Sequence, residues 1–326
     1  MNTKVGERLT PKRVGEWALN NTNILLMFTL IIAGAIADKA FFTPGNLANV
    51  LRQITVNGML AVACTMTLLV NGFDLSIGHI MALSAVLCIG VEKTHGPVVA
   101  VVVALSAGAA VGLVNGILMK ITRGGSGEGF MITLATGMMA QALAKGYCDG
   151  SEIVRGQNVA NTGWLSFLGK GSLWGIPVCA LVWITVMLIL QFVIKKTTFG
   201  RKMLLTGANK KSAYLAGINA GRVKVIAYTV AGIVCGLAAV LFAARFDSAS
   251  DGSGVGGDFN GAVISIVGGN ALYGGHGGMT QVFIGAVTFG LITNILQLLG
   301  IPTDIQYIIQ GAILLLAINL DRFKKR

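Results

Sequence analysis

Long apolar runs separated by short polar segments make up most of this chain. Runs of about 20 residues are long enough to cross ~30 Å of hydrocarbon as helices. A helix satisfies its backbone hydrogen bonds internally, as the bilayer core requires. The pattern therefore predicts an all-α membrane protein, a polytopic bundle of about ten transmembrane helices. The predicted spans are residues 24–42, 49–70, 74–92, 97–119, 130–147, 173–194, 223–244, 259–272, 280–299 and 304–320.

The first apolar run has two interpretations. Basic residues from Lys4 to Arg13 precede it, and Ala35-Ile36-Ala37 resembles a cleavage site, as in a secretory signal peptide. The long polar lead and the length of the run favour an uncleaved first span. We then expect a cytoplasmic segment at 1–23, one membrane domain at 24–320 and a basic cytoplasmic tail at 321–326.

The charged residues lie mostly between the apolar runs. They make up 12% of the chain, against 54% hydrophobic residues, and leave a net charge of +12. Such a charge could indicate nucleic acid, but Lys and Arg held on the cytoplasmic side of a membrane explain it better. With both termini cytoplasmic, 18 of the 25 basic residues fall on that side. We therefore expect a lipid bilayer and no nucleic acid as the chain's environment.

Glycines interrupt or mark several runs. The run 259–272 is short and rich in glycine, and another run breaks at Asn71-Gly72. Broken spans of this kind indicate a transport site or a hinge. Glycines also recur every four residues at Gly108, Gly112 and Gly116, and at Gly232 and Gly236, which lets helices approach closely. Packing within the chain is the favoured interpretation of these stripes, and a subunit interface is the alternative.

No enzyme or energy-coupling motif is visible in the sequence. There is no Gly-x-x-x-x-Gly-Lys-Ser/Thr loop for a nucleotide, and the five cysteines and three histidines are scattered. The chains of buried carboxylates and histidines used by proton-coupled transporters are also missing. We expect no catalytic residue, no metal and no cofactor bound by this chain, which counts against a transporter that powers itself.

Polar side chains inside the predicted spans are nearly all uncharged. Such a lining suits a neutral, hydroxyl-rich solute that needs hydrogen bonds and no ion pair. Each residue could instead bond a neighbouring helix, and Asp74 could equally cap the helix that it precedes. The candidate path residues are Asn71, Asp74, Ser76, Asn115, Thr133, Gln141, Asn270, Asn294 and Gln297.

A basic island runs from Lys195 to Lys224, with eight Lys or Arg and no acidic residue. Asn209 is a good N-cap and Gly217 a good C-terminal stop, so a helix of two turns is predicted between them. A helix this short is marginal alone in water and needs a partner surface. We favour a docking element over a loop that only sets the topology.

Several ordered motifs, from the break at Asn71 to the C-terminal region, resemble one family. The chain looks like the permease subunit of bacterial ATP-binding-cassette importers of the ribose, xylose and galactose type. The matching pieces are Asn71-Gly72-Phe73-Asp74-Leu75-Ser76-Ile77-Gly78, Gly112-Leu113-Val114-Asn115-Gly116, Phe130-Met131-Ile132-Thr133-Leu134, Thr198-Phe199-Gly200-Arg201, Gly207-Ala208-Asn209, Ala216-Gly217-Ile218-Asn219, Gly268-Gly269, Gly274-Gly275-His276-Gly277-Gly278 and Gln310-Gly311-Ala312-Ile313.

The resemblance implies partners and a location. They are a separate ATPase that uses ATP and magnesium, a second permease subunit, identical or related, a periplasmic solute-binding protein, and the bacterial inner membrane. The extracytoplasmic loops 148–172 and 245–258 would face the binding protein, where their acids could meet basic residues or only be solvated. The cytoplasmic loop 195–222 would couple the permease to the ATPase, through Gly200, Arg201, Gly207, Asn209, Ala213, Tyr214, Gly217, Ile218 and Asn219.

Two segments depart from the family's usual residues, at 127–129 and 257–260. They leave room for a monosaccharide or for a related solute such as a polyol, a furanone signal or a nucleoside. A secondary transporter or facilitator without an ATPase remains the alternative function, and an intramembrane enzyme would need a catalytic constellation that the sequence lacks.

Overall fold

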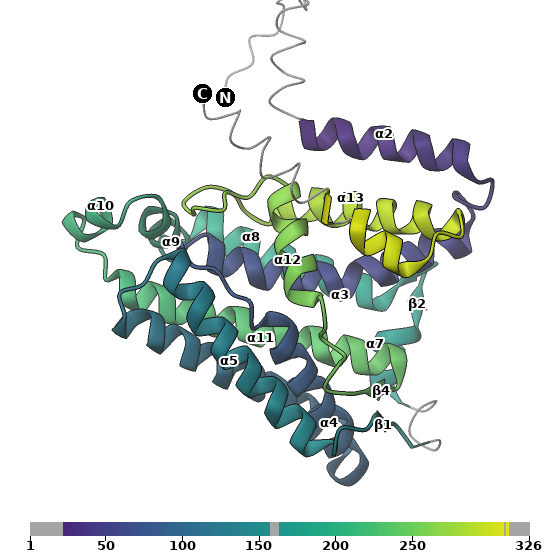
Figure 1. Cartoon of the computed structure of the whole chain (residues 1–326), viewed down its shortest axis with the longest axis horizontal. Helices are drawn as coiled ribbons and strands as arrows, with labels where there is room; N and C mark the ends of the chain where they lie inside the picture. Colours follow the sequence, from purple (N-terminus) through teal and green to yellow (C-terminus); the bar gives the residue numbers. More distant parts are fainter. Residues whose placement is uncertain (1–21, 157–162, 310, 313–326) are drawn as a thin grey trace, which may run out of the picture.

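The computed structural model describes residues 22–156, 163–309 and 311–312. The described chain is mostly helical, so the prediction of an all-α fold is confirmed (Figure 1). The helices are α2 (Thr22–Ala37), α3 (Pro44–Leu68), α4 (Ile77–Ile121), α5 (Ser126–Tyr147), α7 (Trp164–Lys170), α8 (Val178–Lys196), α9 (Thr198–Ala208), α10 (Lys210–Leu215), α11 (Ala220–Phe246), α12 (Gly257–Val267) and α13 (Met279–Leu298).

Four two-residue strands interrupt the helices of the described chain, and the sequence pattern did not predict them. They are β1 (Ile153–Val154), β2 (Ser172–Leu173), β3 (Ile176–Pro177) and β4 (Ser248–Ala249). Strands β1 and β4 pair antiparallel, with Ile153 opposite Ala249, and β2 and β3 form a hairpin. The β1–β4 pair ties two loops together that are far apart in the sequence.

Five helices of the described chain are long and apolar enough to cross a membrane: α3, α4, α8, α11 and α13. Helix α4 has 45 residues, which at ~1.5 Å per residue is about twice the bilayer core. It kinks at Gly96, whose φ of 79° lies in the left-handed region, directly before Pro97. Its first arm (77–95) and second arm (97–121) thus correspond to two separate predicted spans.

Some predicted boundaries are wrong. The span expected at 173–194 begins only at Val178, because the β2–β3 hairpin turns through Trp174 and Gly175 at positive φ. The spans at 24–42 and 259–272 end early, at Ala37 and Val267. Of the span at 304–320, residues 303–309 are helical, while 310 and 313–320 lie outside the described residues, as do 1–21 and the tail 321–326.

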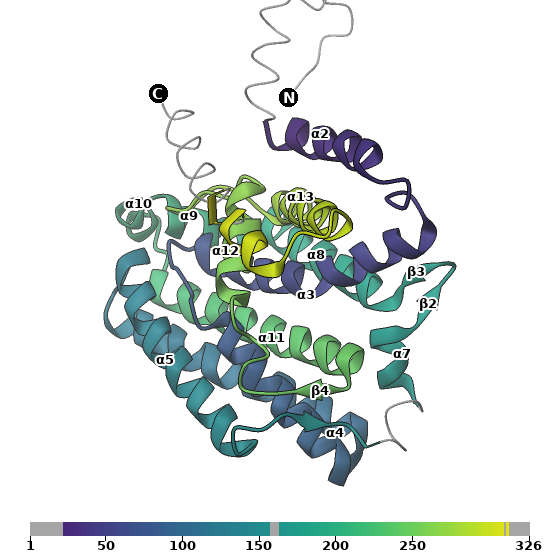
Figure 2. The same ribbon diagram turned by 45° about the vertical axis from the view of Figure 1, so that its right-hand side comes forward.

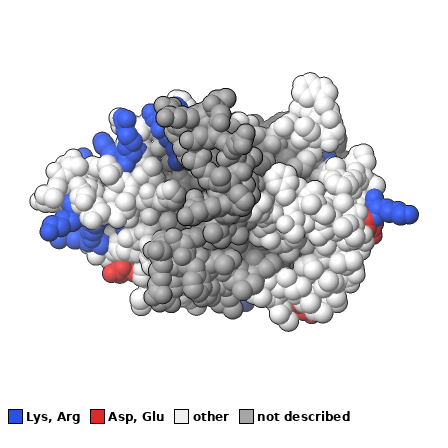
Figure 3. Space-filling model, turned by 90° about the horizontal axis from the view of Figure 1, so that it is seen from above, with Lys and Arg blue, Asp and Glu red and all other residues white. Residues whose placement is uncertain are grey.

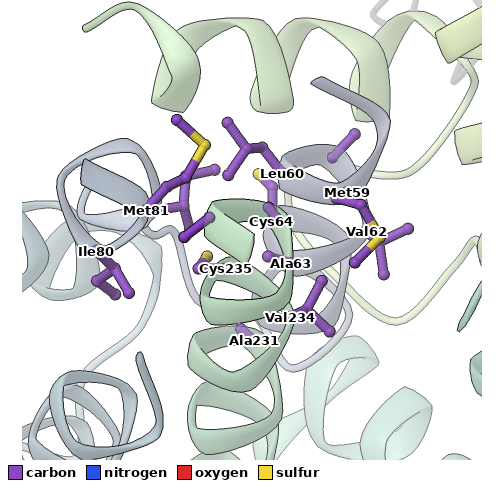
Figure 4. Close-up of a cluster of buried hydrophobic side chains, with 14 of the residues drawn as sticks. Met59, Leu60, Val62, Ala63, Cys64, Ile80, Met81, Ala231, Val234 and Cys235 are labelled. Carbon is purple, nitrogen blue, oxygen red and sulfur yellow. The ribbon is translucent and has the colours of Figure 1, made fainter. Parts of the chain in front are cut away.

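The core lies where α3, the first arm of α4 and α11 meet. Side chains from all three helices converge in Figure 4, among them Cys64, Met81 and Cys235. From Met59 to Val70 every residue of α3 and the turn after it is buried. A helix that is buried all round needs no polar face, and the hydroxyl of Thr65 donates to its own helix, at the carbonyl of Ala61.

The glycine stripes place α4 against α11. A Cβ atom on Gly108 would collide with the carbonyl oxygen of Gly232, and one on Gly236 would meet the backbone of Ala104. Because only glycine leaves room for this approach, the two backbones pack directly on each other. The predicted packing within the chain is confirmed.

The short elements gather at the two ends of the bundle. Helices α9 and α10 lie at one end, and α7 and all four strands lie at the other (Figures 1 and 2). Blue side chains cluster at the α9–α10 end in Figure 3, where Lys196, Arg201, Lys202, Lys210 and Lys211 are exposed. The basic island therefore occupies one pole of the molecule.

We expect Gly108→Ala to lower the free energy of unfolding by ~1–3 kcal/mol, since the added methyl group must separate two packed backbones. The matched variant is Gly146→Ala on α5, where an added Cβ meets nothing within 4 Å. That variant should be neutral or slightly stabilising, because Ala favours a helix. Unfolding in mixed detergent micelles measures both, and equal stability would contradict the close packing of α4 and α11.

Candidate functional site

A cavity of about 410 Å³ opens between α3, α11, α12 and α13, toward the end that carries β4. Helix α3 contributes Gln53 and Asn57, and α13 contributes Thr293 and Gln297. Each pair is four residues apart and so shares one face of its helix. Asn260 of α12 joins them. The cavity is of the size at which small-molecule sites begin.

The cavity lining combines neutral polar groups with aromatic rings. Phe242, Phe246 and Phe289 line it beside the amides. Arg245 brings the cationic group, with its guanidinium 4.9 Å from the ring centre of Phe246 and its Nη1 donating to the carbonyl of Arg52 over 2.7 Å. Such a lining offers hydrogen bonds and apolar surface together, which suits a molecule with hydroxyl groups on a carbon ring.

One polar atom near this cavity has no partner within the described chain. Gln53 donates from Nε2 to Oε1 of Gln297 over 2.9 Å, but its own Oε1 is buried and unpaired. A buried acceptor without a donor costs free energy.

Four of the predicted path residues form one buried network away from the cavity. The carboxylate of Asp74 accepts from the N–H and the hydroxyl of Ser76, over 2.8 and 2.5 Å. Asn115 donates to the Ser76 hydroxyl over 2.8 Å. Thr133 accepts from the N–H of Leu75 over 2.9 Å. The network joins the break after α3 to α4 and α5.

The two carboxylate oxygens of Asp74 have different surroundings in this network. Its Oδ1 takes both bonds from Ser76, which is the N-cap residue of α4 and makes no side-chain cap hydrogen bond itself. The carboxylate thus bonds the residue before the helix, and none of its bonds in the described chain goes to an N–H of the first turn of α4. Its Oδ2 is buried and has no partner within the described chain. Thr136 completes the network by donating to the Asn115 side-chain oxygen over 2.6 Å.

The remaining predicted path residues lie in different places, and the first of them, Asn71, accepts from the hydroxyl of Ser126 over 2.6 Å. Asn270 accepts from the N–H of Gly278 over 2.8 Å and donates to Thr65, which holds the break after α12 against α3. The side-chain amides of Asn294 and Asn46 form two hydrogen bonds with each other. Gln297 lines the cavity, whereas the half-buried Gln141 does not. Most of the predicted path residues thus form hydrogen bonds with neighbouring helices or loops and do not line the cavity.

The basic island contains two helices in place of one. The predicted insert is α10, where Asn209 accepts from the N–H of Ser212 over 3.0 Å and Gly217 has a φ of 72°. Preceding it is α9, which the sequence pattern missed although Thr197 caps it by accepting from the N–H of Gly200. A threonine at the end of one helix and the start of another was the available signal.

The candidate coupling residues divide into supports and exposed positions. Ala213 is buried, while Tyr214 is 79% exposed on α10. Asn219 caps α11 by accepting from the N–H of Arg222 over 3.0 Å. Gly200, in the first turn of α9, packs closely on the backbone at the end of α8. Arg201 is exposed, and Ile218 packs on the core. Tyr214 and its neighbours are therefore available for a partner.

Three backbone segments meet at the C-terminal end of α9, which is one of them. A Cβ on Gly207 would collide with the carbonyl oxygen of Leu69 and lie 2.5 Å from the nitrogen of Gly275. Gly275 itself donates to Leu69 over 3.2 Å. Both broken spans, 69–76 and 268–278, thus contact each other and the end of α9. We call this meeting point the glycine junction.

An ion-pair cluster fastens the loops at the opposite end. Arg155 binds the carboxylate of Glu92 with two hydrogen bonds of 2.6 and 2.7 Å, and it binds Asp247 over 3.1 Å. Lys170 also binds Asp247. The expectation that acids of these loops are free for a partner is therefore wrong for Asp247, and also for Asp258, which is buried. Sequence reasoning missed Glu92 and Arg155, because their pairing is visible only after folding.

The comparison with protein families gives one match. The family described as "Branched-chain amino acid transport system / permease component" matches residues 46–318. The chain belongs to this permease family. It is therefore a transport subunit and a multi-pass membrane protein.

Curated relatives of the permease match over nearly its full length. It is 36% identical over 299 residues, 91% of each chain, to the ribose import permease protein RbsC of Bacillus subtilis (strain 168). It is 31% identical over 314 residues, 95% of each chain, to RbsC of Escherichia coli (strain K12). The fructose import permease protein FrcC of Rhizobium meliloti is 29% identical over 93% of this chain and 85% of its own. No solved structure matches significantly.

We expect Arg155→Leu to destabilise the permease by ~3–5 kcal/mol, because it leaves Glu92 buried and unpaired. The double variant Arg155→Leu with Glu92→Leu should recover much of that loss. Lys170→Gln is the control, since its ammonium is half exposed and such pairs contribute only ~0–1 kcal/mol. Thermal unfolding of the purified variants measures all three, and additive effects of the two leucines would contradict the coupling.

Proposed function

We propose that this permease forms the membrane path of an ATP-driven importer for a monosaccharide or a related neutral, hydroxylated solute. The observation that carries the proposal is the cavity of amides and aromatic rings, in a chain whose relatives are named for importing ribose and fructose. Gln53, Asn57, Asn260 and Gln297 would exchange hydrogen bonds with hydroxyl groups. The phenylalanines would cover the apolar face of the ring.

The energy would enter at the opposite pole. We propose that a separate ATPase, using ATP and magnesium, docks on α9 and α10, whose Tyr214 and Leu215 are exposed. A shift of α9 would be transmitted through the glycine junction to both broken spans, because their backbones touch it directly. Opening the path to one side at a time then follows from the tilt of the helices that these breaks join.

The assembly and topology are part of the same proposal. A second permease subunit would complete the path, and a periplasmic binding protein would deliver the solute to the loops that the Arg155 cluster holds. We propose about ten spans with both termini cytoplasmic in a bacterial inner membrane. The basic pole at α9 and α10 supports the cytoplasmic orientation of that end (Figure 3).

Transport in membrane vesicles tests this function against the alternative. Vesicles carrying the permease, its ATPase and its binding protein should accumulate one of the sugars that its relatives import only when ATP is present inside. Vesicles carrying the permease alone should show no uptake down a gradient. Gradient-driven uptake by the permease alone would instead make it a secondary transporter or facilitator.

We expect Asn57→Leu and Asn260→Leu each to reduce uptake about tenfold at limiting solute, since each removes a hydrogen bond to a hydroxyl group. Gln141→Leu is the control, because Gln141 lies outside the cavity. Initial uptake rates in the complete vesicles measure the effect. Equal loss in the control and the cavity variants would argue against the cavity as the solute site.

We expect Gly217→Val to uncouple ATP hydrolysis from transport. A β-branched residue resists the φ of 72° that ends α10, whereas Asn tolerates it. Gly217→Asn should therefore keep most of the uptake rate. Gly217→Val should lower the uptake rate at least tenfold while the ATPase stays bound. Solute-stimulated ATPase activity and uptake are measured together, and full uptake by Gly217→Val would reject the coupling role of α10.

A further inference from the structure

A second, larger cavity lies on the basic pole, between α10, the end of α4 and the start of α11. Its volume is about 1060 Å³. None of its 13 lining residues is acidic. Five of them are basic, namely Lys120, Arg123, Lys210, Lys211 and Lys224. A concave surface with charge of one sign concentrates the opposite charge. We call it the basic pocket.

Hydrogen bonds fix the walls of the basic pocket. The Nζ of Lys210 donates to the carbonyl of Arg123 over 2.7 Å, which ties α10 to the end of α4. The Nζ of Lys224 donates to the carbonyls of Asn71 and Gly124. The stem of Lys120 lies against Gly221, where a Cβ would come within 2.7 Å of its Cγ. Lys120, Lys210 and Lys224 are therefore held around the pocket by contacts with the fold.

The cations of the basic pocket have no acidic partner of their own within the described chain. The ion pairs of the described residues lie at the other pole, around Arg155 and Asp247. Glu128 is the acidic residue near Lys224 and Lys210, but it does not line the pocket, and its carboxylate accepts from the N–H of Gly125 at the start of α5. The first turn of α11 also borders the pocket and adds the positive end of its dipole.

An exposed apolar strip leads directly to the pocket. Leu113 and Ile117 are 42% and 41% exposed on the second arm of α4. Residues three or four apart share a helix face, so Leu113, Ile117 and Lys120 follow one another along it. The strip ends at the cations, and Tyr214 of α10 stands on the other side of the pocket. Apolar surface, then cations and a tyrosine, is the order of layers at a membrane surface.

We propose that the basic pocket binds the phosphate headgroup of an anionic phospholipid, whose acyl chains lie along the exposed face of α4. Basic pockets beside membrane helices suit such headgroups. The bound lipid would neutralise the cations between α10 and α4 and stabilise the position of α10 against the end of α4. The inference does not depend on the proposed solute, although the pocket shares Tyr214 of α10 with the proposed ATPase surface.

Native mass spectrometry of the full chain in mild detergent tests the proposal. Short-chain phosphatidylglycerol is titrated beside short-chain phosphatidylcholine and soluble glycerophosphate. The unaltered chain should retain phosphatidylglycerol at least tenfold better than either. A variant with Lys120→Gln, Arg123→Gln and Lys210→Gln should lose that preference, since each cation near the surface adds roughly a fivefold factor.

The matched control carries Lys195→Gln, Lys196→Gln and Lys202→Gln, the same loss of charge at exposed residues of the same pole that do not line the pocket. It should bind phosphatidylglycerol as the unaltered chain does. If the pocket variant fails to fold, the charge-keeping variant Lys120→Arg with Lys210→Arg replaces it and should keep the preference, while Arg123→Gln alone should weaken it several-fold.

Three results would overturn the proposal. Equal retention of phosphatidylglycerol by the pocket variant and the control would remove the site. Glycerophosphate bound as tightly as phosphatidylglycerol would make it a site for soluble anions. Unchanged lipid binding, with association of the ATPase lost in the pocket variant alone, would assign the pocket to a protein interface.

Discussion

The direct backbone contact between α4 and α11 at Gly108 and Gly232 is the constraint on which the rest of the structure depends. Lipid offers helices little hydrophobic reason to associate, so close packing must hold them. This contact places Asn115 of α4 beside Ser76 and brings Lys224 of α11 to the carbonyl of Asn71. The first break is thereby clamped from two sides, and its unpaired backbone groups find partners within the protein.

The two poles of the bundle are built by different physics. At the pole of β1 and β4, Arg155 and Glu92 form a buried ion pair that holds the loops rigidly. At the pole of α9, glycine backbones touch at Gly207 and Gly275 without side chains between them. A rigid surface suits the delivery of a solute, and a junction of backbones suits the transmission of movement. The cavity lined by Gln53 and Asn260 lies toward the rigid pole.

Much of the fold could be predicted from the sequence, and less of the site. The apolar runs, the kink between the arms of α4, the two breaks and the caps of α10 each have a local signal, and the structure has them all. Helix α9 was missed although Thr197 marks its start, and the β2–β3 hairpin was missed because tertiary contacts decide elements as short as two residues. Of the candidate path residues, Gln297 lines the cavity, whereas Asn115 and Asn294 bond neighbouring helices. A polar residue in an apolar run has both fates open to it.

The sequence by itself determined that this chain is a helical membrane protein of a permease family, with its basic residues gathered in the segment around α10. Hydrophobic length, glycine spacing and charge sign are local properties, and each can be read along the chain. Only the tertiary structure decided which polar groups face a cavity and which face each other. Gln53 and Thr293 line the cavity, whereas Asp74 and Ser76 bond each other. Orientation across helices depends on contacts between residues that are distant in sequence.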